Sequence, residues 1–377
     1  MKAPIQSSKP CFPPKEIDWI LQEIRTVLES GSLTVGTQVK QFEKKFAEYI
    51  GVRHAICVSD GTVSLEIILR YYDVKGWEVI VPTNTFIASQ NAVILAGGRP
   101  VFADMHESSL CAGLKEIKRQ HTNQTKGVML VHIAGFISPE IDEIRAYCKK
   151  HSLFLIEDAA HAHGATWKGQ KTGSLADAAS FSFFPTKVMT TGEGGMITTN
   201  QEALAEFAKL FRNHGAKEGG TTHDVFGYNS QMDEVRGVLG RSQLRILDAM
   251  LAKRREIAKQ YKTGLKLVKG LELIRLPKGM DASFYKFPIL VSTVERRKAL
   301  SEALQKHGIK SGSVYWPPCH LQPVVLARPE LYGVRGPYPV SEDILPRILC
   351  LPMHPQLDTM TVNQIISAVK TENKKLR

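Results

Sequence analysis

Between residues 54 and 158, short apolar runs alternate with longer stretches that have helical periodicity. The runs predict strands and the stretches between them predict helices. Strand, helix and strand at this spacing indicate an α/β fold, in which helices cover both faces of a mainly parallel sheet and a binding crevice lies at the carboxyl ends of the strands. The expected strands are residues 54–59, 78–82, 100–104, 127–132 and 153–158, and the expected helices are residues 62–73, 86–96, 114–121 and 139–150.

The chain has 377 residues, which is long enough for two domains and a large buried core. Residues 1–14 are polar and proline-rich and predict an N-terminal arm. Residues 15–250 predict a large domain, and residues 251–377 predict a smaller α+β domain. Further helices are expected at residues 15–30, 38–50, 201–212, 294–307 and 361–371, and a strand at 285–291. Residues 233–264 are also expected to be helical, but in separate pieces.

Composition excludes several classes of protein. Hydrophobic residues make up 43% of the chain and charged residues 23%, as in ordinary globular proteins. No run approaches the roughly 18 apolar residues of a membrane span, and the N-terminus has no apolar signal core. The six cysteines are scattered without a Cys-x-x-Cys pair, so we expect free thiols and a cytoplasmic protein with no membrane contact.

The formal net charge of +12 raises the question of nucleic acid. However, the lysines and arginines are dispersed, and their short clusters fall at the ends and faces of expected helices. A solvated basic surface accounts for this pattern, so we expect no nucleic-acid partner. A basic surface would also attract a small anionic substrate such as a phosphate or a nucleotide.

Ser180 to Asn200 reads SFSFFPTKVMTTGEGGMITTN and predicts a hairpin with Lys187 in its loop. Beside apolar surface the charged form of a lysine is disfavoured, so its amine can reach the neutral state that attacks a carbonyl and forms a Schiff base. Most lysines near glycine loops are instead solvated surface charges. The hairpin alone therefore does not decide the role of Lys187.

Two other expected strands end in polar residues. The sequence Ser59-Asp60-Gly61-Thr62 begins a helix, where free backbone amides would receive a phosphate, although an ordinary helix N-cap has the same composition. Asp158 ends a fully apolar strand, where a carboxylate is costly unless it meets a positive partner or a donor.

Asp158 has two possible partners. His161 and His163 after the strand, with Asp158 and His132, could hold a divalent metal, as in a metal-dependent hydrolase. Alternatively, Asp158 could keep a pyridinium nitrogen protonated. Pyridoxal phosphate requires such a carboxylate, a Schiff-base lysine and a phosphate cup, and Lys187, Ser182 and residues 61–62 would complete this set. One cofactor explains all of these features, whereas a metal leaves Lys187 and Gly61 unexplained.

The order of these residues resembles, along nearly the whole chain, the DegT/DnrJ/EryC1/StrS family of fold-type I pyridoxal-phosphate aminotransferases, which aminate keto sugars and keto cyclitols. The matching motifs begin at the residue given and read SDGTVSL at Ser59, EVIVPTNTFIAS at Glu78, LAGGRPVFAD at Leu95, VHIAG at Val131, IEDAAHAHGA at Ile156, FSFFPTK at Phe181, GEGG at Gly192, RNHG at Arg212, GYNSQM at Gly227, CHLQP at Cys319 and ILCLPMHP at Ile348.

The resemblance implies a role for each predicted cofactor residue. Lys187 would carry the Schiff base and move the proton, and Asp158 would pair with the pyridine nitrogen. Phe86 would stack on one ring face, and His161 would lie on the other side near the phenolic oxygen. The residues implied to bind the phosphate are Gly61, Thr62 and Ser182.

Two implied contacts lie farther along the chain. Asn229 would reach the cofactor of the neighbouring subunit, so the resemblance implies a homodimer with shared active sites. His320 would sit near the substrate. The segment Tyr315-Trp316-Pro317-Pro318 before it could form a substrate wall, although a packed domain seam is the commoner reason for such a segment. His163 is interpreted as structural.

Two positions depart from the family pattern. Many members have glutamine where this chain has His161, and a histidine adds a possible charge near neutral pH. Many also have arginine where this chain has Gln231, which removes a fixed positive charge that helps to bind a carboxylate. The second departure leaves the identities of the amino donor and the acceptor open.

The predicted function is transfer of an amino group from glutamate or glutamine to a nucleotide-linked keto sugar. The product would be an amino sugar for a cell-surface polysaccharide. Alternatives within the family are a keto-cyclitol aminotransferase and a pyridoxal-phosphate-dependent sugar dehydratase. Such dehydratases typically have histidine in place of the lysine, so Lys187 favours transamination. A regulatory protein that binds the cofactor is a non-enzyme alternative, but no DNA-binding domain is appended.

Overall fold

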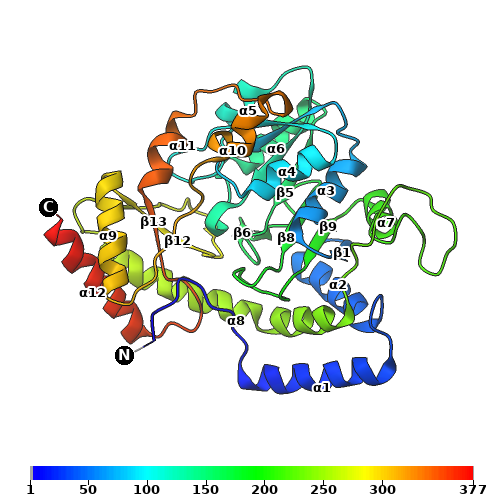
Figure 1. Cartoon of the computed structure of the whole chain (residues 1–377), viewed down its shortest axis with the longest axis horizontal. Coiled ribbons are helices and arrows are strands. Elements are labelled where there is room, and N and C mark those ends of the chain that lie inside the picture. Colours follow the sequence, from blue (N-terminus) through cyan, green and yellow to red (C-terminus); the bar gives the residue numbers. More distant parts are fainter. Residues whose placement is uncertain (1–2, 377) are drawn as a thin grey trace.

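The computed structural model describes residues 3–376, and within them one sheet of seven strands forms the centre of the molecule (Figure 1). In spatial order its strands are β1 (His54–Val58), β9 (Gly195–Thr199), β8 (Ala178–Ser182), β5 (Phe154–Asp158), β4 (Thr125–Val131), β2 (Glu78–Pro82) and β3 (Arg99–Ala103). Neighbouring strands from β8 to β3 are parallel, whereas β9 is antiparallel to both β1 and β8. The predicted α/β fold and the predicted hairpin around Lys187 are therefore confirmed.

Helices cover both faces of this sheet, as the alternating pattern predicts. Along β2, the side chains of Val79 and Val81 join the apolar cluster beneath one set of helices, and Ile80 joins the cluster on the opposite face. The helices on the first face are α3 (Gly61–Tyr71), α4 (Ile87–Leu95) and α7 (Glu202–Phe211). Those on the second face are α2 (Thr37–Ile50), α5 (Leu114–Gln120), α6 (Ile141–Lys150) and α8 (Glu234–Leu265).

Helix α8 is one continuous helix of 32 residues, so the expectation of separate pieces is wrong. Two of its internal glycines, Gly237 and Gly240, are contact points with α2: a Cβ at Gly240 would lie 2.4 Å from the ring of Phe42. The carboxylate of Glu234 also accepts hydrogen bonds from the amides of Gln38 and Val39 at the start of α2. The close packing of α8 on α2 offsets the low helix propensity of these glycines.

The C-terminal part contains an antiparallel sheet of β10 (Leu271–Leu273), β12 (Phe287–Val291) and β13 (Ile348–Leu351). Its helices and turns are α9 (Val294–Lys306), α10 (Pro323–Ala327), α11 (Pro339–Ile344), α12 (Thr359–Lys375), η2 (Cys319–Leu321), η3 (Pro329–Leu331) and η4 (Leu345–Arg347). A small sheet, whose strands are β6 (Thr166–Trp167), β7 (Gln170–Lys171) and β11 (Met280–Asp281), joins it to the large part. The predicted boundary at residue 250 lies inside α8, so the two parts share a helix.

Two segments far apart in the sequence connect these parts by backbone hydrogen bonds. Residue 333 pairs with the edge strand β3, because its amide donates to the carbonyl of Pro100 over 2.8 Å. In the N-terminal arm, Ile5 exchanges backbone hydrogen bonds with Gly308 and Lys310 of the C-terminal part. Helix α1 (Pro14–Ser30) follows the arm and lies along α8 (Figure 1).

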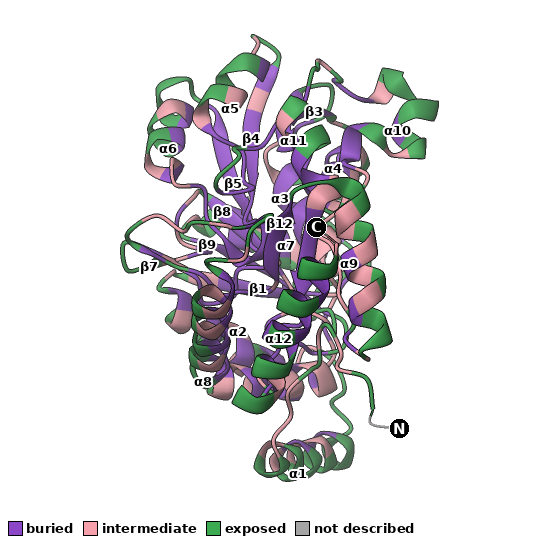
Figure 2. Ribbon diagram, turned by 90° about the vertical axis from the view of Figure 1, so that its left-hand side faces the viewer, coloured by how far each residue is buried: buried purple, intermediate pink, exposed green. Residues whose placement is uncertain are grey.

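Burial is concentrated in the sheet and the inner helix faces, whereas the outer faces of α1, α9 and α12 are exposed (Figure 2). Among the described residues, none of the helices has the length and apolar character needed to span a bilayer. The short turn η1 (Ile133–Gly135) follows β4 at the carboxyl end of that strand. The carboxyl ends of β1, β2, β5 and β8 lie at the same edge of the sheet and face the C-terminal part.

Candidate active site

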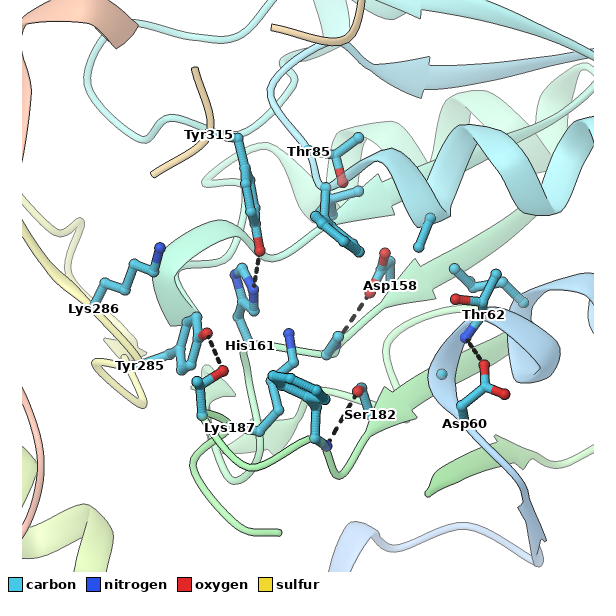
Figure 3. A pocket seen from close by; sticks show the side chains of 18 of the residues that line it. Asp60, Thr62, Thr85, Asp158, His161, Ser182, Lys187, Tyr285, Lys286 and Tyr315 are labelled. Atoms are coloured by element: carbon cyan, nitrogen blue, oxygen red, sulfur yellow. Dashed lines mark hydrogen bonds between the residues drawn. The ribbon is translucent and has the colours of Figure 1, made fainter. Parts of the chain in front are cut away.

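A cavity of about 360 Å³ lies at the carboxyl ends of the strands (Figure 3). The start of α3, the loop after β2, the ends of β5 and β8, and two segments of the C-terminal part contribute to its wall. Seven residues predicted from the sequence line it together: Gly61, Thr62, Phe86, Asp158, His161, Ser182 and Lys187. The sheet topology explains this convergence, because the strands that precede these residues end at the same edge.

Asp158 ends β5 and is 7% exposed. Its carboxylate accepts hydrogen bonds from the hydroxyl of Ser89 over 2.7 Å and from the amide of Ala160 over 3.2 Å. Both donors are neutral, and no lysine, arginine or histidine within residues 3–376 forms an ion pair with it. A buried carboxylate with only neutral donors favours a cationic N–H partner, as the sequence predicts.

Lys187 lies in the loop between β8 and β9, with its ammonium group 5.1 Å from the ring centre of Tyr285. Burial is the main cause that lowers the pKa of Lys187 to about 8; in this net value the negative charge of Asp158 acts in the opposite direction, and the positive charge of Lys286 acts in the same direction as burial. At pH 7 roughly a tenth of this amine is therefore neutral, far more than for a solvated lysine. The lysine is thus poised as a nucleophile near neutral pH.

The start of α3 is a capped helix terminus. The carboxylate of Asp60 accepts hydrogen bonds from the amides of Thr62 over 2.8 Å and Val63 over 3.0 Å. Of the two alternatives that the sequence left open for these residues, the structure shows the N-cap, which uses the amide of Thr62. Gly61 packs so closely on β8 that a Cβ would lie 2.8 Å from Cβ of Ser182. This contact places the hydroxyl groups of Thr62 and Ser182 at the same end of the cavity.

His161 is buried and neutral, because burial and the charge of Lys187 hold its pKa well below the usual value. Its ring is stacked on Tyr285, with the centres 4.1 Å apart. Nδ1 accepts the amide of Ala134 over 3.3 Å, so the proton of the neutral ring is on Nε2 and is donated to the hydroxyl of Tyr315 over 3.0 Å. The hydrogen of that hydroxyl remains available to a group in the cavity.

Phe86 is 54% exposed although it lies beside buried residues. Its ring centre lies 5.5 Å from that of Tyr315, and the two rings are tilted by 41°. An exposed phenyl ring at a cavity wall provides a flat apolar surface for an aromatic ligand. This arrangement fits the stacking role that the resemblance implies.

The donors of the alternative metal site are not gathered. His132 forms a hydrogen bond with the buried carboxylate of Glu157 over 2.7 Å. His163 packs against the rings of Phe181 and Phe183, and burial lowers its pKa to about 3. Nowhere in residues 3–376 are three His, Cys, Asp or Glu side chains placed to share an ion. The arrangement therefore does not favour the hydrolase alternative.

Two predicted site residues lie outside the cavity of this chain. Asn229 is exposed in the loop between α7 and α8, where its side chain accepts the amide of Gln231 over 3.4 Å. His320 is buried, and its two ring nitrogens pair with the hydroxyl of Thr83 and the carboxylate of Glu342. The contact of Asn229 with a neighbouring subunit and that of His320 with substrate stay predictions.

Tyr285 and Lys286 are among the residues of the cavity wall that sequence reasoning missed. They come directly before β12 in the C-terminal part, and no local motif marks them. Of the segment 315–318, which the sequence suggests as a substrate wall, Tyr315 lines the cavity. The sequence predicts a strand that begins at residue 285, but this does not indicate a site. Only the contact between the two parts shows that Tyr285 and Lys286 reach the cavity.

The wall residues fit pyridoxal phosphate. Asp158 is a buried carboxylate without a cation, Lys187 is a lysine with a lowered pKa, and Phe86 offers an exposed ring. The hydroxyl groups at the far end suit a phosphate, which accepts hydrogen bonds on several oxygens. These residues could therefore hold the nitrogen, aldehyde, ring face and phosphate of the cofactor.

Comparisons with known proteins agree with this site. The chain is 36% identical over 355 residues to dTDP-3-amino-3,6-dideoxy-alpha-D-galactopyranose transaminase of Aneurinibacillus thermoaerophilus, covering 93% of this chain and 94% of the relative. It is 34% identical over 336 residues to GDP-perosamine synthase of Escherichia coli O157:H7, covering 89% and 90%. Spr1654 of Streptococcus pneumoniae in its PLP form superposes with a TM-score of 0.89 at 26% identity, covering 99% and 100%.

The profile of one family matches residues 14–370, almost the whole chain. Its members are aminotransferases that use pyridoxal phosphate, in agreement with the donor set of the cavity. The chain belongs to the DegT/DnrJ/EryC1/StrS aminotransferase family.

Proposed function

We propose that the protein transfers an amino group from glutamate or glutamine to a nucleotide-linked keto sugar. The observation that carries this proposal is the pair of Lys187, whose pKa is about 8, and Asp158, a buried carboxylate without a cation, in one cavity. Relatives named as transaminases or synthases of dTDP- and GDP-linked amino sugars support the substrate class. The basic charge of the chain is compatible with an anionic substrate.

Pyridoxal phosphate, when bound, supplies an electron sink that makes a bond at the amine-bearing carbon of the substrate labile. The protein supplies positioning and proton transfer. Lys187 accepts and returns the proton with its amine, which is partly neutral near pH 7. Asp158 holds an N–H cation in place through its buried carboxylate, and Phe86 restrains the ring plane. The stacked pair of His161 and Tyr285 closes the cavity on another side.

The substrate class can be tested directly. The purified protein is mixed with glutamate or glutamine and a panel of nucleotide-linked keto sugars and keto cyclitols, and products are identified by mass. We expect an amino sugar nucleotide from at least one sugar and none with Lys187→Ala. An aminated cyclitol alone, or a deoxygenated sugar without nitrogen, would assign the activity to one of the family alternatives.

We also propose that the protein is a homodimer in which Asn229 serves the neighbouring subunit's site. The exposed position of Asn229 supports this, because the residue is free to contact another chain. Large apolar side chains exposed on and after α1 also support it: Leu21 and Leu28 are 61% exposed and Leu33 is 50% exposed.

A complementation experiment tests the shared site. Lys187→Ala and Asn229→Ala homodimers, each inactive, are unfolded and refolded together in equal amounts. Random pairing makes about half of the dimers mixed, and each mixed dimer has one intact site, so about a quarter of all sites should recover. No recovery, with mixed dimers shown to have formed, would mean that both residues serve the site of one chain.

The proposed location is the cytoplasm, and the proposed product is an amino sugar for a cell-surface polysaccharide. Support for the location comes from the six cysteines, none of which is paired in a disulfide. Support for the pathway comes from a relative named as a spore coat polysaccharide biosynthesis protein in Bacillus subtilis, 34% identical over 369 residues. Fractionation and analysis of surface sugars in a deletion strain would test both.

A further inference from the structure

Lys286 enters the cavity from the C-terminal part, directly before β12 (Figure 3). Its ammonium group donates a hydrogen bond to the carbonyl of Ser313 over 2.6 Å and lies 3.5 Å from the carbonyl of Val314. It also lies 5.2 Å from the ring centre of Tyr315 and 5.7 Å from that of Tyr285. Carbonyl oxygens and aromatic rings thus hold this cation in a fixed position.

No anion neutralises this charge. Within residues 3–376, none of the ion pairs involves Lys286, and the oxygens that it contacts are neutral carbonyls. A partly buried ammonium group loses hydration that carbonyls replace only in part. A lysine held in this way at a cavity wall can gain a charge-assisted hydrogen bond from an anionic ligand.

The described wall of the cavity contains only two cations, Lys187 and Lys286. Lys187 is the reacting amine in the proposed function, so it is not a permanent anion-binding group. Gln231, where many family members have arginine, lies outside this cavity and donates to the side chain of Asn213 over 2.6 Å. Lys286 is therefore the fixed positive charge that this chain offers to a substrate in its own cavity.

The location of Lys286 relative to Lys187 selects one kind of anion. Both ammonium groups lie beside the ring of Tyr285, at 5.1 Å and 5.7 Å from its centre. The amino donor must present its α-carbon to Lys187, and its α-carboxylate is one bond away from that carbon. The diphosphate of a sugar nucleotide, by contrast, is separated from the reacting carbonyl carbon by atoms of the sugar ring.

We propose that Lys286 binds the α-carboxylate of the amino donor and so selects α-amino acids as donors. This inference rests on the proposed aminotransferase function and adds a specificity-determining residue to it. The hydroxyl of Tyr315, whose hydrogen is available to the cavity, lies on the same side.

The donor half of the reaction tests this without any sugar. The holoenzyme is mixed with glutamate, and the change in cofactor absorbance is followed as a function of glutamate concentration for the wild type, Lys286→Met and Lys286→Arg. We expect Lys286→Met to raise the half-saturating glutamate concentration about ten- to a hundredfold, because a charge-assisted hydrogen bond is lost. Lys286→Arg should recover much of this loss. Lys298→Met, which removes an exposed lysine on α9, should match the wild type.

A binding measurement separates recognition from turnover. Calorimetry compares α-methylglutamate, which has an α-carboxylate but no α-hydrogen, with 4-aminobutyrate, which lacks the α-carboxylate. The wild type should prefer α-methylglutamate, and Lys286→Met should lose this preference while 4-aminobutyrate binds as before. Melting curves show whether the variant is folded; if Lys286→Met is not, Lys286→Gln takes its place.

The possible results distinguish this inference from the proposed function. Unchanged glutamate saturation and unchanged ligand preference in folded Lys286→Met would overturn the inference. The same holds if only the KM of the sugar nucleotide rises, since Lys286 would then serve the diphosphate. If the wild type completes the donor half-reaction but aminates no keto sugar, the proposed acceptor is wrong, and the role of Lys286 is still decided by the glutamate data.

Discussion

The two walls of the cavity differ in how the chain builds them (Figure 3). The first wall consists of residues at the ends of parallel strands, among them Asp158, Ser182 and Lys187. The second wall consists of Lys286 and Tyr315 with the neighbouring Tyr285, all from the C-terminal part. Sheet geometry fixes the first wall, whereas only contacts between distant segments place the second. We infer that the first wall performs the chemistry and the second recognises substrate.

Specific contacts hold the second wall in place. The guanidinium of Arg254, buried on α8, donates to the carbonyls of Phe284 and Met353 over 3.0 Å each. The hydroxyl of Ser283 donates to the carbonyl of His161 over 2.7 Å. Because these contacts hold the side chain of Ser283 and the backbone carbonyl of Phe284, they fix the start of the segment that carries Tyr285 and Lys286. The second wall therefore depends on α8, the helix that both parts share.

The largest effect is expected from Lys187→Ala in the first wall. Loss of the nucleophile and proton carrier should lower turnover by at least about 1,000-fold. Steady-state kinetics measure the loss. In the wild type, borohydride reduction followed by peptide mapping should find the cofactor attached to Lys187. Recovery of the cofactor on another lysine would contradict the role of the first wall.

Asp158→Asn should have the next largest effect. The amide has the shape of the carboxylate and still offers an oxygen to the donors Ser89 and Ala160, but it carries no negative charge to hold an N–H cation. We expect turnover to fall on the order of a hundredfold while the cofactor remains bound. Turnover and the cofactor content of the purified variant measure the two parts of this prediction. Near-normal turnover would exclude Asp158 from the chemistry.

The contrast between the walls also explains what could be predicted from sequence. Asp158 was recognisable because an acidic residue ends a fully apolar strand. Lys187 was recognisable only when its hairpin was combined with Asp158, a phosphate cup and the order of the family motifs. Lys286 lies before a strand in a part of the chain without such a motif. Its role depends on the approach of Tyr315, whose partner His161 is 154 residues away in sequence. Sequence motifs and periodicity indicate only local structure, whereas the contact between Tyr315 and His161 joins distant parts of the chain.

Contacts between distant segments, or the choice between two local structures, also decide two other regions, helix α8 and the start of α3. Helix α8 was expected in separate pieces, but it is continuous, and Gly240 within it is the surface against which Phe42 packs. For Ser59 to Thr62 the sequence is compatible with both an N-cap and a phosphate site, and the structure shows that Asp60 accepts the amide of Thr62 as an N-cap.

A smaller effect is expected from Tyr315→Phe in the second wall. The substitution removes the acceptor of the His161 proton and the hydroxyl hydrogen that faces the cavity, but it keeps the aromatic ring beside Phe86. Loss of one neutral hydrogen bond corresponds to about a tenfold decrease in kcat/KM. Kinetics with each substrate varied in turn measure it. A loss as large as that of Asp158→Asn would assign Tyr315 to the chemistry instead.

The smallest expected effect is a shift in pH dependence that links the two walls. In the cofactor-free protein, attachment of pyridoxal phosphate requires neutral Lys187. Burial lowers the pKa of Lys187 from 10.5 to about 8, so the amine is protonated below that pH and neutral above it. The attachment rate, followed by absorbance, should therefore rise with pH through a midpoint near 8.

The two walls act on this midpoint with opposite sign. The positive charge of Lys286 lowers the pKa of Lys187, so Lys286→Met should move the midpoint to higher pH, and Lys286→Arg should leave it near the wild-type value. The negative charge of Asp158 raises that pKa, so Asp158→Asn should move the midpoint to lower pH. Shifts in the same direction, or no shift in either variant, would show that these charges do not meet at Lys187. Opposite shifts would show that one amine senses both walls, the first through attraction and the second through repulsion.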